Sequence, residues 1–276
     1  MRPPLGQHFL RDPHVVQAIL AAAELHPEDS ALEIGPGKGV LTTELIGRVR
    51  HLTAVELDKK LAERLTVRFQ GNPRVTIIQS DFLRLNLSEV FPQAVTPAIR
   101  QPGSIKILGN LPYSITSPIF EKILAWPHWD TGVFLIQREV ADRMRSQPGS
   151  RVYGILSLAV QLFAKVENII QVKPGAFVPP PKVTSTVIRL RRKAVAEVPE
   201  KQIPAFFDLV HAAFAHRRKT LVNSLALYTN LPKEKITPWL RRQRMAPDRR
   251  AETLGLPEYA QMAEAWSIFR RENDLT

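Results

Sequence analysis

Hydrophobic and polar positions follow two periods over the first two thirds of the chain. Short apolar runs predict buried strands at Ala31–Ile34, Leu52–Leu57, Val75–Ile78, Ile105–Leu108, Val133–Ile136, Lys165–Val172 and Thr184–Leu190. Helical spacing of apolar residues predicts helices at Pro13–Ala23, Leu41–Arg48, Lys59–Phe69, Pro118–Ala125 and Arg138–Met144. Asp12 followed by Pro13 is a typical helix start. Strands that alternate with helices indicate an α/β fold with a doubly wound, parallel sheet.

The pattern changes after the last predicted strand. Residues 193–202 are charged and interrupted by proline, which predicts a linker. Beyond it, Ala205–Leu227 reads as one amphipathic helix with Phe206, Leu209, Val210, Phe214, Leu221 and Leu225 on its apolar face. A last helix is expected to begin near Pro257. We therefore expect an α/β domain over residues 1–192 and a small helical domain over 203–276.

The charge of the chain suggests the kind of partner. Its 276 residues include 38 Lys and Arg against 26 Asp and Glu, a formal net charge of +12. Such an excess favours a polyanion, nucleic acid first and an anionic membrane surface second. The absence of cysteine excludes disulfides and zinc–thiolate sites, which suits a reducing cytoplasm. No apolar run reaches the roughly 20 residues of a membrane helix.

Three glycines stand between the first predicted strand and the helix that follows it. Gly35, Gly37 and Gly39 have the spacing G-x-G-x-G, which lets the backbone approach a ligand near a helix N-terminus. A dinucleotide fingerprint needs Gly or Ala at position 40, where this chain has Val40. The loop therefore indicates a nucleotide site whose ligand need not carry phosphate.

Carboxylates at the ends of successive predicted strands narrow the choice of ligand. Glu56 ends the second strand, where it can accept hydrogen bonds from both ribose hydroxyls. Asp81 follows the third strand and can accept one from an adenine amine, and Glu33 adds charge before the first glycine. The only cation in this set is Lys38. Three acids suit a cationic ligand better than a pyrophosphate, and S-adenosylmethionine combines a sulfonium, a ribose and an adenine.

The next predicted strand ends in Asn110-Leu111-Pro112-Tyr113. The side-chain carbonyl of Asn110 and the main-chain carbonyl of Leu111 can both accept N–H bonds from an amine conjugated to an aromatic ring. Pro112 stiffens the backbone, and Tyr113 offers a face on which a base can stack. Such a site works by positioning and electrostatics and needs no strong base. The alternative is a proline turn with a core tyrosine.

These stretches together resemble the KsgA-type family of small-subunit rRNA adenine N6,N6-dimethyltransferases. The resemblance rests on "LGQHFLRD" at 5–12, "EIGPGKGVLT" at 33–42, "AVELD" at 54–58, "SDFL" at 80–83, "NLPYSITSPIF" at 110–120, "QREVADRM" at 137–144, "YGILS" at 153–157, "GAFVPPPKVTSTVIRL" at 175–190 and "RRKTLVNSL" at 217–225. They span most of the chain in the order of the family. "NLPY" is specific to methylation of adenine amines, whereas "GPGKG" alone is not.

The resemblance implies a Rossmann-like methyltransferase fold with a seven-stranded, mostly parallel sheet and a small helical C-terminal domain. It implies dimethylation of two neighbouring adenosines near the 3′ end of small-subunit rRNA, with S-adenosylmethionine as cofactor, in a metal-free cytoplasmic monomer. The implied cofactor contacts are His8, Leu10, Gly35, Gly37, Glu56, Asp81, Phe82 and Asn110. The implied catalytic residues are Asn110, Leu111, Pro112, Tyr113 and Phe177, with Tyr113 and Phe177 enclosing a flipped adenine.

Some positions depart from the commonest family pattern. His8 stands where Asn is frequent, Ser80 where Gly is usual, and Phe82 where a small residue is common. Ile155 occupies a position that is often basic.

Basic side chains supply the candidates for contacts with RNA phosphates, although a solvated helix face is the alternative for any single charge. They are Arg138, Arg143, Arg145, Arg189, Arg191, Arg192, Lys193 and, within "HRRK", Arg217, Arg218 and Lys219.

Other classes of protein remain open. One is an Erm-like large-subunit rRNA methyltransferase, which shares "GQHFL" but not "SPIF" or "RRKTLVNSL". Another is a non-catalytic nucleic-acid-binding relative, which intact Glu56, Asp81 and "NLPY" disfavour. A nicotinamide-dependent oxidoreductase fails on the glycine spacing.

Overall fold

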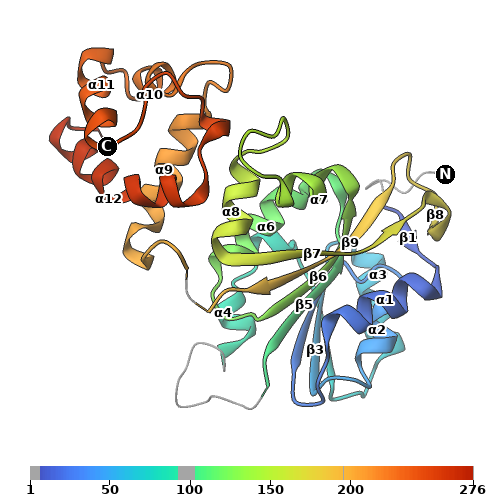
Figure 1. The fold of residues 1–276 in the computed structure, drawn as a ribbon. Coiled ribbons are helices and arrows are strands. Elements are labelled where there is room, and N and C mark those ends of the chain that lie inside the picture. Colours follow the sequence, from blue (N-terminus) through green and yellow to red (C-terminus); the bar gives the residue numbers. More distant parts are fainter. Residues whose placement is uncertain (1–6, 93–102, 195, 276) are drawn as a thin grey trace. The chain divides into compact units, whose positions relative to one another are not determined.

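The computed structural model describes residues 7–92, 103–194 and 196–275 (Figure 1). Leu5 and Gly6 of the N-terminal motif lie outside the described residues. The chain forms two compact units: Met1–Ala141 with Lys165–Arg192, and Asp142–Ala164 with Lys193–Thr276. Residues 142–164 thus group with the C-terminal unit, which begins earlier in the chain than the helical domain expected at residue 203.

The first unit is built on a seven-stranded sheet in the order β4-β3-β2-β5-β6-β9-β7 (Figure 1). Its strands are β2 (Ser30–Ile34), β3 (His51–Glu56), β4 (Val75–Gln79), β5 (Ile105–Asn110), β6 (Thr131–Gln137), β7 (Ala164–Val172) and β9 (Ser185–Arg192). Neighbours from β4 to β6 run parallel, and β9 runs antiparallel to β6. The mostly parallel sheet expected from the sequence is confirmed, so the carboxyl ends of β2 to β5 share one edge, where such sheets bind ligands.

The helices of this part of the chain also follow the expected pattern. They are α1 (Pro13–Ala23), α2 (Val40–Leu45), α3 (Lys59–Arg68), α4 (Leu87–Val90), α6 (Thr116–Ala125) and α7 (Arg138–Arg145). Asp12 caps α1 by accepting a hydrogen bond from the amide of His14 at 2.9 Å, and Pro13 is the first helical residue. This helix start is confirmed as expected.

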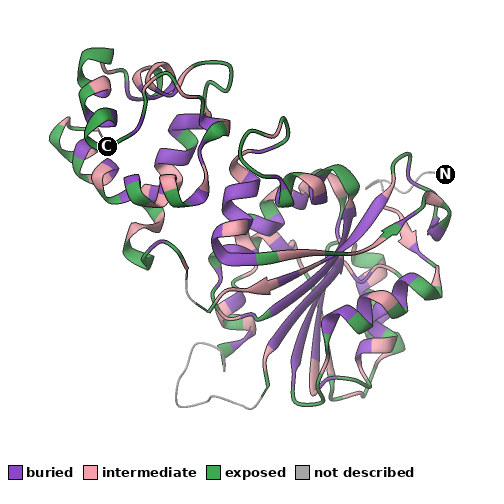
Figure 2. Cartoon of the chain, in the orientation of Figure 1, coloured by how far each residue is buried: buried purple, intermediate pink, exposed green. Residues whose placement is uncertain are grey.

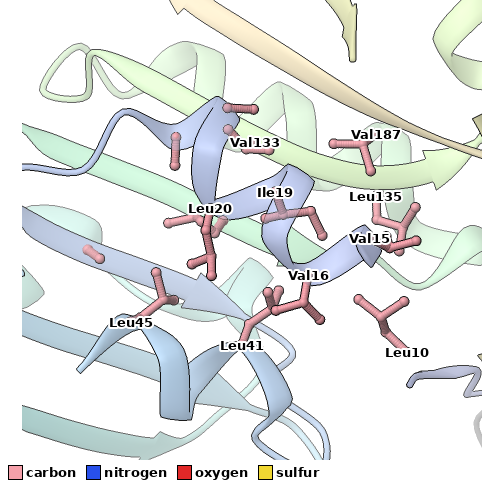
Figure 3. Close-up of a cluster of buried hydrophobic side chains, with 14 of the residues drawn as sticks. Leu10, Val15, Val16, Ile19, Leu20, Leu41, Leu45, Val133, Leu135 and Val187 are labelled. Atoms are coloured by element: carbon pink, nitrogen blue, oxygen red, sulfur yellow. The ribbon is translucent and has the colours of Figure 1, made fainter. Parts of the chain in front are cut away.

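Helix α1 packs against one face of the sheet. Its residues Val15, Val16, Ile19 and Leu20 lie between α2 and the strands β6 and β9 (Figure 3). The strands β2, β3, β5, β6 and β9 are buried along most of their length, whereas the edge strands β4 and β7 are largely half-buried or exposed (Figure 2). Burial of such side chains contributes about 1.5–3 kcal/mol each, and this packing keeps the ligand-binding edge of the sheet rigid.

A second, two-stranded sheet pairs β1 (Phe9–Leu10) antiparallel with β8 (Phe177–Val178). Leu10 lies opposite Phe177, and the amide of Arg11 donates to the carbonyl of Ala176 at 2.9 Å. The turn η4 (Pro174–Ala176) precedes β8. Two residues are too few to show alternation, so the sequence did not predict this pairing of the N-terminal arm, residues 7–11, with the segment between β7 and β9.

The second unit is helical, as expected. It contains α8 (Ile155–Phe163), α9 (Ile203–Phe214), α10 (Leu221–Thr229), α11 (Lys233–Arg242) and α12 (Leu256–Glu272). The single helix expected over Ala205–Leu227 is wrong, because residues 215–220 turn between α9 and α10. The buried hydroxyl of Ser224 stabilises this turn: it donates to the carbonyl of Ala212 and accepts from the amide of His216. Among the described residues, no helix is both long and apolar enough to cross a membrane.

Candidate active site

The polar residues expected at the strand ends line one pocket in the first unit. Sequence-predicted residues in its wall are His8, Gly35, Gly37, Glu56, Asp81, Phe82, Asn110, Leu111, Pro112 and Tyr113. The remaining lining residues were not assigned to the site from the sequence: Gln7, Phe9, Ile34, Val55, Leu57, Ser80, Ser114, Ile115 and Ile119. Gln7 and Phe9 flank His8 in the quoted "GQHFL" motif, which was the available signal for them. No lysine or arginine is among these lining residues.

The glycine loop forms the floor of the pocket between β2 and α2. Gly35 and Gly37 have φ angles of 68° and 56°, in the left-handed region that favours glycine. A Cβ on Gly37 would lie 3.1 Å from a ring carbon of Phe9, so the loop also makes room for the N-terminal arm. Lys38 is exposed, with its ammonium 4.8 Å from the centre of the Phe9 ring, and does not line the pocket.

Glu56 ends β3 and is 3% exposed. One carboxylate oxygen accepts from the amide of Gly37 and the other from the amide of Asp58, each at 2.9 Å. The side chain is therefore fixed between the glycine loop and the start of α3. Each oxygen keeps acceptor capacity for a ligand hydroxyl, because a carboxylate oxygen has two lone pairs.

Asp81 follows β4 and caps the short turn η1 (Phe82–Arg84), accepting from the amide of Leu83 at 2.9 Å. Its other oxygen lies 3.7 Å from the Arg84 guanidinium, whose side chain is exposed. The loop is held close to β3 because the amide of Ser80 donates to the carbonyl of Glu56 at 3.0 Å. Asp81 thus keeps a carboxylate oxygen for a ligand amine.

Glu33 was expected to be a third charged carboxylate around the ligand, and the structure places it elsewhere. It is buried, does not line the pocket, and accepts from the hydroxyl of Thr42 at 2.7 Å. Burial raises the pKa of Glu33 to about 7, and the nearby Glu56 carboxylate adds to this shift while Thr42 opposes it. Its share of the negative charge near neutral pH is therefore smaller than the sequence suggested.

Asn110 ends β5, opposite Leu135 of β6. Its side-chain amide donates to the main-chain carbonyl of His8 at 2.8 Å. The next residue, Leu111, donates its amide to the carbonyl of Leu135 at 3.1 Å. Among the described residues, the Leu111 carbonyl accepts no hydrogen bond. Two acceptors, the Asn110 side-chain oxygen and the Leu111 carbonyl, are thus available at this strand end.

The rest of the Asn-Leu-Pro-Tyr motif leads into helix α6. Pro112 precedes the turn η3 (Tyr113–Ile115), and its carbonyl accepts from the hydroxyl of Thr116 at 2.9 Å. The hydroxyl of Tyr113 lies 2.7 Å from that of Ser185, which fixes the ring. Burial raises the pKa of Tyr113, so the phenol stays neutral.

His8 is the aromatic neighbour of Tyr113. The two ring centres are 5.7 Å apart with 29° between the planes. Nδ1 of His8 lies 2.8 Å from the carbonyl of Pro179. A carbonyl only accepts hydrogen bonds, so Nδ1 carries the proton. The N-terminal arm therefore contacts both ends of the Asn-Leu-Pro-Tyr motif.

Leu10 and Phe177 are buried and lie outside the pocket wall. Phe177 is 2% exposed and Leu10 is 6% exposed, and both pack in the core cluster that surrounds α1. The pairing of β1 with β8 buries both side chains. Neither side chain lines the pocket. The roles that the resemblance implies for them, Phe177 enclosing the flipped adenine and Leu10 contacting the cofactor, stay predictions.

Four of the basic candidates contact acidic side chains or main-chain carbonyls within the protein. Arg189 and Arg191 form ion pairs with Glu24 and Glu167, and Arg192 donates to the carbonyls of Leu124 and Trp126. Lys193 pairs with Glu197 at 2.9 Å. These four side chains are therefore engaged in contacts within the protein.

The "HRRK" residues all lie in the turn between α9 and α10 and are exposed. Arg217 donates to the carbonyl of Tyr153 at 2.9 Å and to that of Arg151, within the same unit. Arg138 and Arg143 lie on α7, and both are exposed. Arg217 thus combines an internal contact with an exposed position.

Comparison with known proteins gives a consistent picture. A family model described as "Ribosomal RNA adenine dimethylase" matches residues 1–267. Proteins named Ribosomal RNA small subunit methyltransferase A are similar over 95% of this chain. That of Desulfitobacterium hafniense is 43% identical, with 90% of its length covered. That of Bacillus cytotoxicus is 39% identical, with 89% covered.

Two solved structures share the fold. A dimethyladenosine transferase from Plasmodium falciparum superimposes with a TM-score of 0.75 at 22% identity, over 95% of this chain and 98% of that one. The 23S rRNA methyltransferase ErmE superimposes with a TM-score of 0.66 at 27% identity, over 94% of this chain and 99% of that one.

Proposed function

Because the chain belongs to the ribosomal RNA adenine dimethylase family, we propose that it dimethylates the N6 amines of two adjacent adenosines near the 3′ end of small-subunit rRNA. The methyl donor is S-adenosylmethionine. The observation that carries this proposal is that Asn110, Glu56 and Asp81 line one pocket. A site that holds ribose, adenine and a reacting amine needs these three groups together.

The polar groups of the pocket fit this cofactor. Glu56 offers acceptors to the ribose hydroxyls, Asp81 to the adenine amine, and the backbone at Gly35 and Gly37 to the methionine part. No cation lines the pocket, which suits a ligand that is itself positive at sulfur. When bound, S-adenosylmethionine supplies a methyl group on that positively charged sulfur.

The chain's own contribution to chemistry is to hold the target amine. The side-chain oxygen of Asn110 and the carbonyl of Leu111 accept its two N–H bonds and favour a pyramidal nitrogen, whose lone pair is then free to react. Pro112 holds these carbonyls in place. Tyr113 stacks on the base, a contact worth about 1–3 kcal/mol. Positioning of this kind lowers the barrier without a strong base.

His8, and not Phe177, lies against the Tyr113 ring. Phe177 supports the site indirectly, because β8 holds the arm that carries His8.

Recognition of the RNA is assigned to the helical residues 203–276, beyond a linker at 193–202 and a catalytic domain at 1–192. Arg138, Arg143, Arg217, Arg218 and Lys219 are exposed and suit phosphate contacts. The proposed setting is the assembling small ribosomal subunit in the cytoplasm, with a single chain as the acting unit.

An Erm-like activity on large-subunit rRNA is the second candidate, because the fold of ErmE is similar. The higher identity to proteins named for the small subunit favours the first. Labelled methyl transfer to naked small-subunit rRNA, immature small subunits and large subunits, run side by side, tests this choice. Label in small-subunit RNA alone supports the proposal, whereas label in large-subunit RNA alone refutes it.

A further inference from the structure

Lys122 of α6 joins that helix to the loop that follows β4. Its ammonium donates to the carbonyl of Leu83 at 2.9 Å and to the carbonyl of Leu85. It also lies 5.5 Å from the centre of the Phe82 ring. All three contacts fall on residues 82–85, directly after Asp81.

These contacts complete the capping of η1. Asp81 satisfies the amide of Leu83 at the start of the turn, and Lys122 satisfies the carbonyls of Leu83 and Leu85 at its end. An anion at the start and a cation at the end both stabilise a helical turn. Asp81 is therefore held by a turn whose two ends are fixed, which limits the directions that its second carboxylate oxygen can take.

Helix α6, which carries Lys122, connects the Asn-Leu-Pro-Tyr motif with the loop that follows Asp81. Helix α6 follows η3 directly, and Thr116 at its start donates to the carbonyl of Pro112. Ile119, three residues before Lys122 and hence on the same helix face, lines the pocket beside Phe82 and Asp81. One rigid helix thus carries a contact to the amine-holding motif and a contact to the Asp81 loop.

The environment of Lys122 fits a side chain that is held in place by these contacts. Its side chain is half-buried. Burial lowers the pKa of the Lys122 ammonium, and the Asp81 carboxylate acts in the opposite direction. A lysine with only a solubilising role would extend into water and leave the two carbonyls to other partners.

We propose that Lys122 is a positioning residue that keeps Asp81 and Phe82 in the positions that bind the adenine part of the cofactor. This inference rests on the proposed function of the pocket, since it takes S-adenosylmethionine as the ligand. Lys122 touches neither substrate nor cofactor. It acts through the loop 81–85, so its loss should affect recognition of adenine more than any other property of the site.

Calorimetry with two ligands tests the inference. S-adenosylhomocysteine carries the adenine amine that Asp81 would bind, and S-inosylhomocysteine carries an oxygen in its place. Lys122→Met should weaken binding of S-adenosylhomocysteine about tenfold and that of S-inosylhomocysteine much less. Lys122→Arg should keep most of the adenine preference, because a guanidinium also donates to carbonyls. The KM for S-adenosylmethionine should rise in Lys122→Met, while kcat stays within about threefold of the wild type.

Lys60→Met is the matched control, because Lys60 is exposed on α3 and its side chain lies away from the pocket wall. It should bind both ligands as the wild type does. Equal weakening of both ligands in Lys122→Met would overturn the inference, since it would mean a general structural role. If Lys122→Met does not fold, Lys122→Gln decides: its shorter neutral side chain reaches one carbonyl at most, and an unchanged adenine preference would overturn the inference. A wild-type protein that binds neither ligand would instead refute the proposed cofactor.

Discussion

The side-chain amide of Asn110 donates a hydrogen bond to the main-chain carbonyl of His8 at 2.8 Å. A carbonyl oxygen can only accept, so this contact fixes which end of the amide faces the arm. The nitrogen of Asn110 points to His8, and its oxygen is left to accept an N–H bond from the target amine. The N-terminal arm thereby sets the orientation of the residue at the centre of the proposed reaction.

This relationship predicts the behaviour of Asn110→Asp. Aspartate keeps the acceptor for the target amine but cannot donate to His8 when ionised, so two oxygens would face each other. We expect kcat at saturating S-adenosylmethionine to fall about 100-fold or more, the scale of losing one contact made in the transition state. Single-turnover methylation of small-subunit rRNA measures this directly.

A matched control is Asn86→Asp at the N-cap of α4. Aspartate keeps the side-chain oxygen that accepts from the amide of Ser88. It loses the donor to the exposed Glu89 carboxylate, so stability should fall slightly while activity should be unchanged. Near-normal activity of Asn110→Asp would show that the contact with His8 is dispensable, and that Asn110 serves only as an acceptor.

The carboxylate of Glu56 should carry much of the cofactor affinity. It is buried, and both its oxygens already accept backbone amides, so its geometry is set before any ligand arrives. Glu56→Ala should weaken binding of S-adenosylmethionine by about 1.5–3 kcal/mol, the worth of hydrogen bonds to a charged group. Calorimetry at fixed pH gives the value.

Glu63→Ala serves as the control, because Glu63 is exposed on α3 and forms only a loose pair with Lys59. Its affinity for the cofactor should match the wild type. Affinity that survives in Glu56→Ala would remove Glu56 from the site.

Glu33 predicts a pH dependence of stability. Its pKa is raised from 4.5 to about 7, so between these values the folded protein holds a proton that the unfolded chain releases. The associated stabilisation is complete below pH 4.5 and is lost as the pH rises through about 7. Glu33→Gln keeps an acceptor for Thr42 but does not titrate. Without ligand, it should match the wild type at acid pH and exceed its free energy of unfolding by about 3 kcal/mol above pH 8.

Denaturant unfolding of both proteins across this pH range tests the prediction. Glu44 of α2, whose side chain is 40% exposed and pairs with Arg48, supplies the control Glu44→Gln, which should show no such divergence. Parallel pH profiles for wild type and Glu33→Gln would mean that Glu33 is charged in the folded state.

Phe177 should behave as a core residue. At 2% exposure, Phe177→Ala should cost about 3–5 kcal/mol of folding free energy and lower the melting temperature. Phe177→Leu fills much of the same volume and should recover most of the stability and methylation. If Phe177→Ala instead keeps its melting temperature and loses methylation, while only aromatic replacements restore it, the ring stacks on the target base.

The residues at the strand ends could be predicted from the sequence because the topology brings them together. Gly35, Glu56, Asp81 and Asn110 each follow an apolar run, and parallel strands place such positions at one edge. No side-chain contact had to be known for this step. The same reasoning succeeded for the cap at Asp12, where all the interacting atoms are local in sequence.

The contacts that orient the site could not be predicted in this way. His8 meets Asn110 and Pro179, and Lys122 meets Leu83, across separations for which the sequence offers no period or motif. The burial of Phe177 depends on a strand pair of two residues. The ion pairs of Arg189 and Arg191 depend on Glu24, more than 160 positions earlier. Each requires the packed fold before it can be recognised.

Nucleoside mass spectrometry of small-subunit rRNA, treated with S-adenosylmethionine and either wild-type or Asn110→Ala protein, tests the central claim most directly. The wild type should produce N6,N6-dimethyladenosine at two adjacent positions near the 3′ end. Asn110→Ala should form it about 100-fold more slowly or worse, although it binds the cofactor almost as well. Methylation of another base, or equal product from the two proteins, would contradict the assignment of this pocket as an adenine dimethylation site.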